Sequence, residues 1–492
     1  MRRLLLKNSH EHIAFVALCL GLGLAAWLIF WNLGRGSIDL WDEALTAGRS
    51  LYIYHTHSLL NLEVNGEISI RKPPLVYALT AMSYGVFGIN ELGLRIPNAM
   101  FGLVTFMVIA WGARKTVGPR WAWLAPWLLL GCFNLIRVSR EALTDTAFVF
   151  GMILAFTVAF VELWAGSEKR WKGLLMPWLF GIGVATALLS KGPLALFAPL
   201  YTLLFLMLLR RDRLRPYLLA STLAIVPFTI WLVAQGAALP QFWSIYLGEE
   251  YMERINYQSS FLTQFVRSPL YYLSNFWRWF RITGAMTVGM TLWLGYICLK
   301  RRNDQACSSF EKVPFFFLSG AWIGYFLLLS LASHKSRRYI LSIFPLITLA
   351  YIIGVRSLWS LAGDFMKKWL VAIVMTISIA VGINAMASHY QAMPDYKPRR
   401  KEVAVVIRPF IEKGYPVCTD APRLAPILHF YLDRTVPVIP GPQAIPDGEW
   451  IFVSSSPISG GERINKDYYM LLQGQNSIGR TTASSGGSEY QK

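Results

Sequence analysis

The chain is built from long apolar runs separated by short polar segments. The runs lie near residues 13–31, 95–113, 121–136, 146–165, 174–190, 193–209, 216–234, 283–299, 313–331, 339–354 and 369–387. Most approach the ~20 apolar residues that a helix needs to cross the membrane core. The segment 75–88 is apolar but short, so it either dips into the membrane and returns or crosses it. The pattern predicts an all-α polytopic membrane protein with an odd number of transmembrane helices, about 11 to 13.

The pattern changes after residue 387. A helical segment, KEVAVVIRPFIEK, is followed by short β-rich runs such as YPVCTD, RTVPVIP and EWIFVSS, which Gly and Pro separate. These features predict a small C-terminal α/β domain at 388–480. We therefore expect a transmembrane catalytic domain at 1–387, with outer loops at 32–74 and 235–282, and a disordered tail at 481–492.

Composition supports this division. Hydrophobic residues make up 54% of the chain and charged residues only 15%, which excludes a typical soluble or disordered protein. The excess of 47 Lys and Arg over 28 Asp and Glu gives a net charge of +19. Because these cations gather in short clusters beside apolar runs, they indicate membrane orientation, and we expect no nucleic-acid partner. Five cysteines in this setting imply no disulfide framework.

The basic clusters predict the orientation. The N-terminus is basic, and no small-residue cleavage site follows the first run, so we expect an uncleaved first span with a cytoplasmic N-terminus. The other predicted cytoplasmic turns are also basic, with Arg114/Lys115/Arg120, Lys169/Arg170/Lys172, Arg210/Arg211/Arg213/Arg215, Lys300/Arg301/Arg302 and Arg356/Lys367/Lys368. In a bacterium this topology means an inner-membrane protein whose loops 32–74 and 235–282 and C-terminal domain are periplasmic.

Several charges at the outer face are not needed for orientation. The cations are Arg71/Lys72, Arg140, Lys191, Arg254 and Lys335/Arg337/Arg338, and the acids are Asp42, Glu43 and Asp145. Each has a simple structural interpretation as well. Asp42 could cap a helix N-terminus, Lys72 could be an interfacial anchor, and Arg140 could form a local turn with Glu141 or Asp145.

Together, these charges predict a reaction. Basic groups can hold a phosphate while a carboxylate takes a proton from an attacking hydroxyl. A phosphate that is already bound by Lys and Arg is a good leaving group. A donor that reaches a site at the membrane surface is best supplied as a lipid-linked phosphate, and lipid-phosphate sugars are the obvious class.

Six segments in order carry a resemblance to a known family. They are WDEALT (41–46), NGEISIRKPPL (65–75), FGINELGLRIPNAMFG (87–102), SREALTDTAF (139–148), SKGPLALFAP (190–199) and SHKSRRYILSIFPL (333–346). They resemble the GT-C-fold glycosyltransferases of the protein O-mannosyltransferase superfamily, and most of all the aminoarabinose transferases that modify lipid A. The resemblance implies a GT-C membrane fold and an inverting sugar transfer from a polyprenyl phosphate such as undecaprenyl phosphate.

The resemblance also implies roles for individual residues. Asp42 would be the acceptor-facing carboxylate and base, with Glu43 beside it and Asp145 as a second acid. The donor phosphate would contact Lys72, Arg254 and Tyr339, with Arg337, Arg338 and Arg71 nearby.

Two positions depart from the aminoarabinose transferase pattern. Arg71 stands where that pattern has an acid, and Tyr251 stands where it has a histidine. Both replacements remove a metal-ligand type. We therefore expect no metal requirement and no other cofactor, and the sugar and the acceptor remain open.

We expect a monomer that transfers a sugar to a periplasmic-face acceptor such as lipid A or another lipopolysaccharide. A protein O-glycosyltransferase of the same fold would differ only in its acceptor. A lipid-linked-sugar transporter is a further alternative, but it would place charges near the bilayer midplane rather than at one face.

Overall fold

The computed structural model describes residues 2–38, 41–165, 173–252, 269–274, 309–331, 335–361 and 399–473, together with isolated positions at 289–292 and 365–387. Contacts divide the chain into two compact units. The first comprises residues 1–35, 49–63 and 68–396, and the second comprises 36–48, 64–67 and 397–492. Each unit is described by itself. The predicted boundary at 387 and the predicted tail at 481–492 fall outside the described residues.

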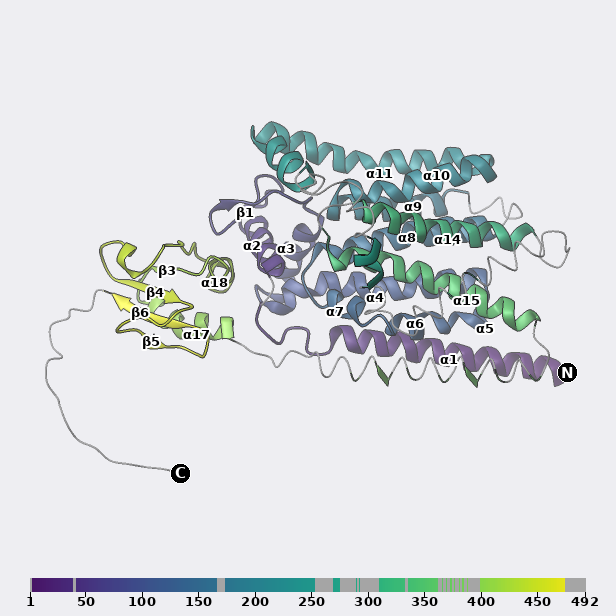
Figure 1. Cartoon of the computed structure of the whole chain (residues 1–492), viewed down its shortest axis with the longest axis horizontal. Helices are drawn as coiled ribbons and strands as arrows, with labels where there is room; N and C mark the ends of the chain where they lie inside the picture. Colours follow the sequence, from purple (N-terminus) through teal and green to yellow (C-terminus); the bar gives the residue numbers. More distant parts are fainter. Residues whose placement is uncertain are drawn as a thin grey trace, which may run out of the picture. The chain divides into compact units, whose positions relative to one another are not determined.

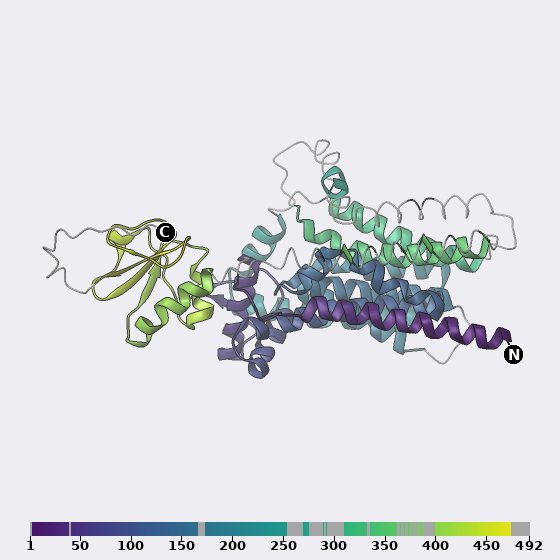
Figure 2. The same ribbon diagram turned by 90° about the horizontal axis from the view of Figure 1, so that it is seen from below.

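The first unit is a helical bundle whose long helices run side by side (Figures 1 and 2). Its elements are α1 (Arg2–Phe30), the second half of α2 (Trp41–Thr56), α3 (Leu75–Phe87), α4 (Glu91–Thr116), α5 (Pro119–Ala122), α6 (Leu124–Leu130), α7 (Phe133–Ser139), α8 (Thr144–Ala165), α9 (Leu175–Lys191), η2 (Pro193–Leu196), α10 (Phe197–Leu209), α11 (Arg211–Ala238), η3 (Ser244–Met252), α14 (Ser309–Ser330), η4 (Arg337–Ser342) and α15 (Ile343–Leu361).

Helix α8 lies at the centre of this bundle. Of its membrane-length segment, 94% is buried, compared with 28% for α1 and 33% for α11. Close packing against α9 depends on glycines, because a Cβ on Gly151 would come within 2.5 Å of the Gly183 carbonyl oxygen. Small residues of this kind let two helix backbones approach inside a membrane. The outer helices α1 and α11 keep the apolar surface that lipid requires.

The described helices confirm a multi-pass membrane protein. Within the described part of the chain, five helices are long and apolar enough to cross a membrane, or six if a bent pair is counted. The bent pair is Pro119–Leu130 and Phe133–Ser139, which meet at 74°, so the run predicted at 121–136 is a broken span or a re-entrant segment. The segment predicted at 75–88 forms α3, whose 13 residues extend only ~20 Å. This length favours a segment that does not cross.

Two predicted spans, 283–299 and 369–387, fall mostly outside the described residues. The total number of spans therefore stays a prediction.

The second unit contains the predicted small α/β domain. Its sheet has the order β3 (Val417–Thr419), β4 (Trp450–Ser454), β6 (Tyr469–Gln473) and β5 (Glu462–Arg463), with β3 parallel to β4 and the other pairs antiparallel. Helices α17 (Arg399–Glu412) and α18 (Ala425–Leu432) pack on it through an apolar core, and η5 (Pro442–Ala444) precedes β4. The first half of α2 also belongs to this unit, and the short hairpin β1 (Glu63–Val64) and β2 (Glu67–Ile68) lies mostly in it.

The cysteine of the C-terminal domain is a core residue. Cys418 is buried, and its thiol donates to the carbonyl of Ile451 at 3.7 Å. Burial raises the pKa of the Cys418 thiol to about 11, because a thiolate would lose its hydration. The thiol therefore stays neutral and packs as a small apolar side chain.

Candidate active site

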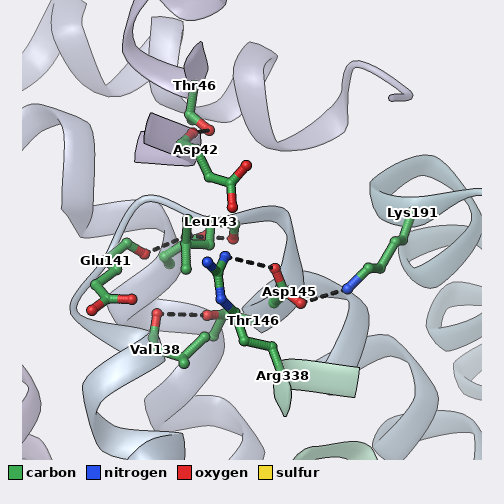
Figure 3. Close-up of polar contacts among 10 residues, drawn as sticks. Asp42, Thr46, Val138, Glu141, Leu143, Asp145, Thr146, Lys191 and Arg338 are labelled. Carbon is green, nitrogen blue, oxygen red and sulfur yellow. Dashed lines mark hydrogen bonds and ion pairs between the residues drawn. The ribbon is translucent and has the colours of Figure 1, made fainter. Parts of the chain in front are cut away.

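Asp145 occupies a rigidly held turn at the start of α8. The loop in front of it is fixed by Asn98 of α4, whose amide nitrogen donates to the carbonyls of Glu141 at 2.7 Å and Leu143 at 2.6 Å. The hydroxyl of Thr146 donates to the carbonyl of Val138 at 2.9 Å and ties the helix start to α7. These bonds, drawn in part in Figure 3, fix the backbone that carries the carboxylate.

Two cations from separate elements point toward this carboxylate (Figure 3). The Lys191 ammonium, at the end of α9, donates to Asp145 Oδ1 at 2.5 Å. The guanidinium of Arg338, in η4, lies 3.8 Å from Oδ2. Asp145 is 5% exposed, and the Lys191 side chain is also buried, whereas the Arg338 side chain is about one-third exposed. Such a buried carboxylate needs this compensation, because an unpaired charge there would be costly.

The surroundings extend the positive cluster. Lys191 lies over the ring of Tyr339, 4.1 Å from its centroid, a geometry that is typical of a cation–π contact. Lys72 also acts electrostatically on Asp145, and Lys191, Arg338 and Lys72 thus act on a single carboxylate. We call this group, Asp145, Lys191, Arg338, Tyr339 and Lys72, the cation cluster.

The other predicted phosphate-binding residues lie in different surroundings. Arg71 and Arg337 are exposed at the surface of the same unit, and Lys72 is half-buried. The segment before Lys72 is held by Arg49, whose guanidinium donates to the Ser69 carbonyl at 2.8 Å and the Tyr77 hydroxyl at 2.7 Å. Arg254 and the side chain of Tyr251 lie outside the described residues. The structure thus brings Arg338 to Asp145 and Tyr339 to Lys191, and Lys72 acts on Asp145 electrostatically, while the phosphate-binding roles stay a prediction.

The opposite end of the bundle has its own charges. Near the far end of α8, Arg213 Nε lies 2.6 Å from Glu162 Oε1, and Arg356 lies over the ring of Trp164 at 5.6 Å. Asp145 and Glu162 lie about 25 Å apart along α8 at 1.5 Å per residue. The cation cluster therefore lies at one end of the bundle, and the described basic residues near Glu162, which are Arg213 and Arg356, lie at the other.

In the second unit, Asp42 and Glu43 lie in the first turn of α2. Asp42 is half-buried, whereas Glu43 is 2% exposed. The helix begins at Trp41, so Asp42 lies inside the first turn rather than at the N-cap position that the capping interpretation requires. Its backbone carbonyl accepts from the Thr46 hydroxyl at 2.9 Å (Figure 3). A carboxylate in a first turn is favoured by the helix dipole.

The segment that carries Asp42 is anchored to the C-terminal domain within this unit. Before the helix, the amide N–H of Ile38 donates to the Tyr431 hydroxyl at 3.0 Å. After it, Asn65 pairs with the backbone of Val436 through two hydrogen bonds, with its amide nitrogen at 2.8 Å from the carbonyl and its oxygen at 2.7 Å from the N–H. Asn65 has a φ of 57°, which asparagine tolerates better than most residues.

Arg140 has a structural role that the sequence did not predict. Its guanidinium donates to the carbonyls of Leu28, Ile29 and Trp31 at 2.8 to 3.0 Å. It therefore satisfies backbone acceptors at the end of α1, where a helix leaves its last carbonyls unbonded. Glu141 pairs with Arg137 at 3.0 Å. This cation, which was predicted to lie at the outer face, needs no phosphate to explain it.

The sequence singled out Lys191 as a cation that orientation does not need, but it indicated neither the partner of Lys191 nor any role for Asn98. A partner for Lys191 could have been expected, because a lysine that directly ends an apolar run is costly without one. No group of three His, Cys, Asp or Glu side chains suited to a metal occurs in the described part of the chain. The expected independence from metal stays a prediction.

Comparison with known proteins identifies the fold. The family described as dolichyl-phosphate-mannose-protein mannosyltransferase matches residues 20–246. The structure is similar to that of ArnT from Cupriavidus metallidurans bound to undecaprenyl phosphate, with a TM-score of 0.66 and 16% identity over 96% of this chain and 99% of that one. The chain has the GT-C fold. The oligosaccharyltransferase of Archaeoglobus fulgidus shares it more distantly, with a TM-score of 0.59 and 13% identity over 86% of this chain and 64% of that one.

A curated relative also resembles the chain in sequence. The undecaprenyl phosphate-alpha-4-amino-4-deoxy-L-arabinose arabinosyl transferase of Edwardsiella ictaluri is 24% identical over 327 residues, 64% of this chain. The match spans only 54% of that relative's length. The GT-C chain thus resembles the aminoarabinose transferases, as its six sequence segments predicted. The matched family and this relative are both named for transfer from a polyprenyl phosphate, dolichyl phosphate in the first and undecaprenyl phosphate in the second.

Proposed function

We propose that this GT-C chain transfers one sugar from a polyprenyl phosphate, undecaprenyl phosphate in a bacterium, to an acceptor at the periplasmic face of the inner membrane. The acceptor we favour is lipid A or another lipopolysaccharide. The observation that carries the proposal is the cation cluster, in which Lys191, Arg338 and Lys72 act on the one carboxylate of Asp145. This concentration of positive charge suits an anionic donor.

The proposed reaction is a displacement at the anomeric carbon of the sugar. The acceptor hydroxyl forms the new C–O bond, the bond to the phosphate oxygen breaks, and the polyprenyl phosphate leaves with that electron pair. Asp42, with Glu43 beside it, takes the hydroxyl proton. Lys72, Arg338 and Tyr339, with Arg71, Arg254 and Arg337, stabilise the charge that grows on the phosphate. Attack opposite the leaving group inverts the anomeric configuration.

In this proposal Asp145 holds the cations rather than accepting a proton. Its two oxygens already face Lys191 and Arg338, which suits it to fix their positions before the donor arrives. Preorganised charges of this kind lose little energy to rearrangement during the reaction. We expect the site to work without a metal, because positively charged side chains supply what a divalent ion would bring to the leaving phosphate.

The test is transfer by the purified full chain in lipid nanodiscs. Undecaprenyl phosphates bearing different sugars are supplied with lipid A, with O-antigen lipid or with a peptide mixture, and free undecaprenyl phosphate and product are measured by mass spectrometry. We expect donor cleavage that depends on a lipopolysaccharide acceptor. Glycosylated peptide instead would establish the protein O-glycosyltransferase, which the match to protein mannosyltransferases favours. A folded protein that cleaves no donor would refute both.

A further inference from the structure

A recess at the other end of the first unit has no part in the proposed reaction. It has a volume of about 360 Å³ and is lined by Glu11, His12, Phe15 and Leu18 of α1, Arg114 of α4, and Pro119 and Ala122 of α5. This volume lies within the range of small-ligand sites. Arg114 lies about 24 Å along α4 from Asn98, the residue that fixes the Asp145 turn, so the recess is remote from the cation cluster.

The recess lies where two spans meet the membrane surface. In α1 the apolar stretch follows Glu11 and His12, and the membrane-length segment of α4 ends at Thr116. Below the recess, α1 exposes Ile13, Val16 and Leu20, each more than half exposed, at 64%, 54% and 61%. In a membrane these side chains face lipid tails. A molecule bound in the recess would therefore have its polar part at the interface and an apolar part along α1.

The walls are held by packing rather than by a mobile loop. Helix α1 is fixed to α6 by Trp127, whose indole N–H donates to the Ala17 carbonyl at 2.9 Å. A Cβ on Gly21 would lie 2.8 Å from the same indole nitrogen, so the glycine allows this close approach. Within the described part of the chain, the side chains of Glu11, His12 and Arg114 form no hydrogen bond or ion pair. Their polar groups remain available to a ligand.

The chemistry of the lining selects one class of ligand. Arg114 and a His12 N–H can donate to a phosphate, and the Glu11 carboxylate can accept from an ammonium group. Phe15 and Leu18 offer an apolar floor. A purely anionic headgroup could use Arg114 and His12 but would bring no cation to the Glu11 carboxylate. We propose that this recess binds a zwitterionic membrane phospholipid whose headgroup joins a phosphate to a primary ammonium, as in phosphatidylethanolamine.

The test is native mass spectrometry of the full chain with phosphatidylethanolamine or phosphatidylglycerol of matched acyl chains. Arg114→Gln should lower bound phosphatidylethanolamine about tenfold, since it removes a charge-assisted contact to phosphate. Lys115→Gln is the matched control, because Lys115 carries the same charge next to Arg114 but does not line the recess. It should change binding less than twofold. Thermal unfolding of each variant establishes that it is folded.

Glu11→Gln tests the ammonium contact separately. The wild-type chain should bind phosphatidylethanolamine over phosphatidylglycerol, and Glu11→Gln should remove that preference. Equal losses in Arg114→Gln and Lys115→Gln, or an unchanged preference in Glu11→Gln, would overturn the site and indicate a general lipid layer. Displacement of the lipid by inorganic phosphate alone would also overturn it, because an anion site would then suffice.

Discussion

The two best candidate carboxylates, Asp145 and Asp42, are built in opposite ways. Asp145 is buried in the helical bundle, and its oxygens face Lys191 and Arg338. Asp42 is half-buried in the first turn of α2, within the unit that contains the C-terminal domain. A carboxylate whose charge is matched by two cations is suited to hold them in place. A half-buried carboxylate at a helix start is better placed to meet an acceptor that arrives from outside.

The largest expected effect follows from Asp42→Asn. General-base catalysis contributes roughly 10²- to 10⁴-fold, so transfer should fall by that factor while donor affinity is unchanged. Rates and donor titrations on the same preparation check this. Asp212→Asn is the matched control, because Asp212 is an exposed acid paired with Arg210 near the opposite end of the bundle. If Asp42→Asn transferred the sugar at a near-normal rate, Asp42 would not be the catalytic base and would only stabilise the helix.

Lys191→Met should mainly destabilise the protein. It leaves the buried Asp145 without its closest cation, and breaking a buried pair costs about 3–5 kcal/mol. The double variant Asp145→Asn/Lys191→Met removes both charges and should recover much of this loss. Thermal unfolding in detergent measures both. If the single and double variants unfold at the same temperature, Asp145 and Lys191 do not depend on each other for stability. The contrast with Asp42 then fails.

Lys72→Met should weaken donor binding by about tenfold to a hundredfold, since a hydrogen bond to a charged group contributes roughly 1.5–3 kcal/mol. A titration with polyprenyl phosphate measures it. Lys413→Met, in the exposed turn directly after α17, serves as a control for the loss of one lysine. If both the donor affinity and the transfer rate were unchanged, Lys72 would be an interfacial anchor and not a phosphate ligand.

Asn65→Ala should have a smaller effect on turnover. It removes two hydrogen bonds to the Val436 backbone, and each contributes about 1 kcal/mol. Because Asn65 anchors the unit that carries Asp42, we expect a severalfold lower rate at saturating donor and an unchanged donor affinity. Tyr431→Phe, which removes the acceptor for Ile38, should act in the same direction. A weaker donor affinity in either variant would contradict a positioning role.

Chelation should have the smallest effect. With Arg71 and Tyr251 in place of an acid and a histidine, the site lacks ligands that a zinc ion favours. Transfer should survive EDTA, and added Zn²⁺ should not raise it. Loss of activity that one divalent ion restores would instead indicate oxygen ligands such as Asp42, Glu43 and Asp145.

Local patterns predicted much of this fold. Within the described part of the chain the apolar runs form helices. The pattern of KEVAVVIRPFIEK and the β-rich runs predicted α17, β3 and β4, because periodicity reports directly on which face is buried. The bend at 74° between Leu130 and Phe133 escaped prediction, since the run is apolar throughout. The contacts of Lys191 with Asp145 and of Asn65 with Val436 join residues 46 and 371 positions apart. No local signal specifies such partners, and three-dimensional packing alone brings them together.

The most direct test compares Asp42→Asn with the charge-neutral pair Asp145→Asn/Lys191→Met. Each variant is reconstituted with saturating donor, and its rate is expressed per mole of folded protein. Our account predicts that Asp42→Asn loses at least about 10² in rate with donor affinity unchanged. The double variant, which removes part of the cation cluster, should mainly weaken donor affinity and keep its rate at saturating donor to within about tenfold. An active Asp42→Asn beside a folded but inactive double variant would contradict the account and make Asp145 the catalytic acid–base group.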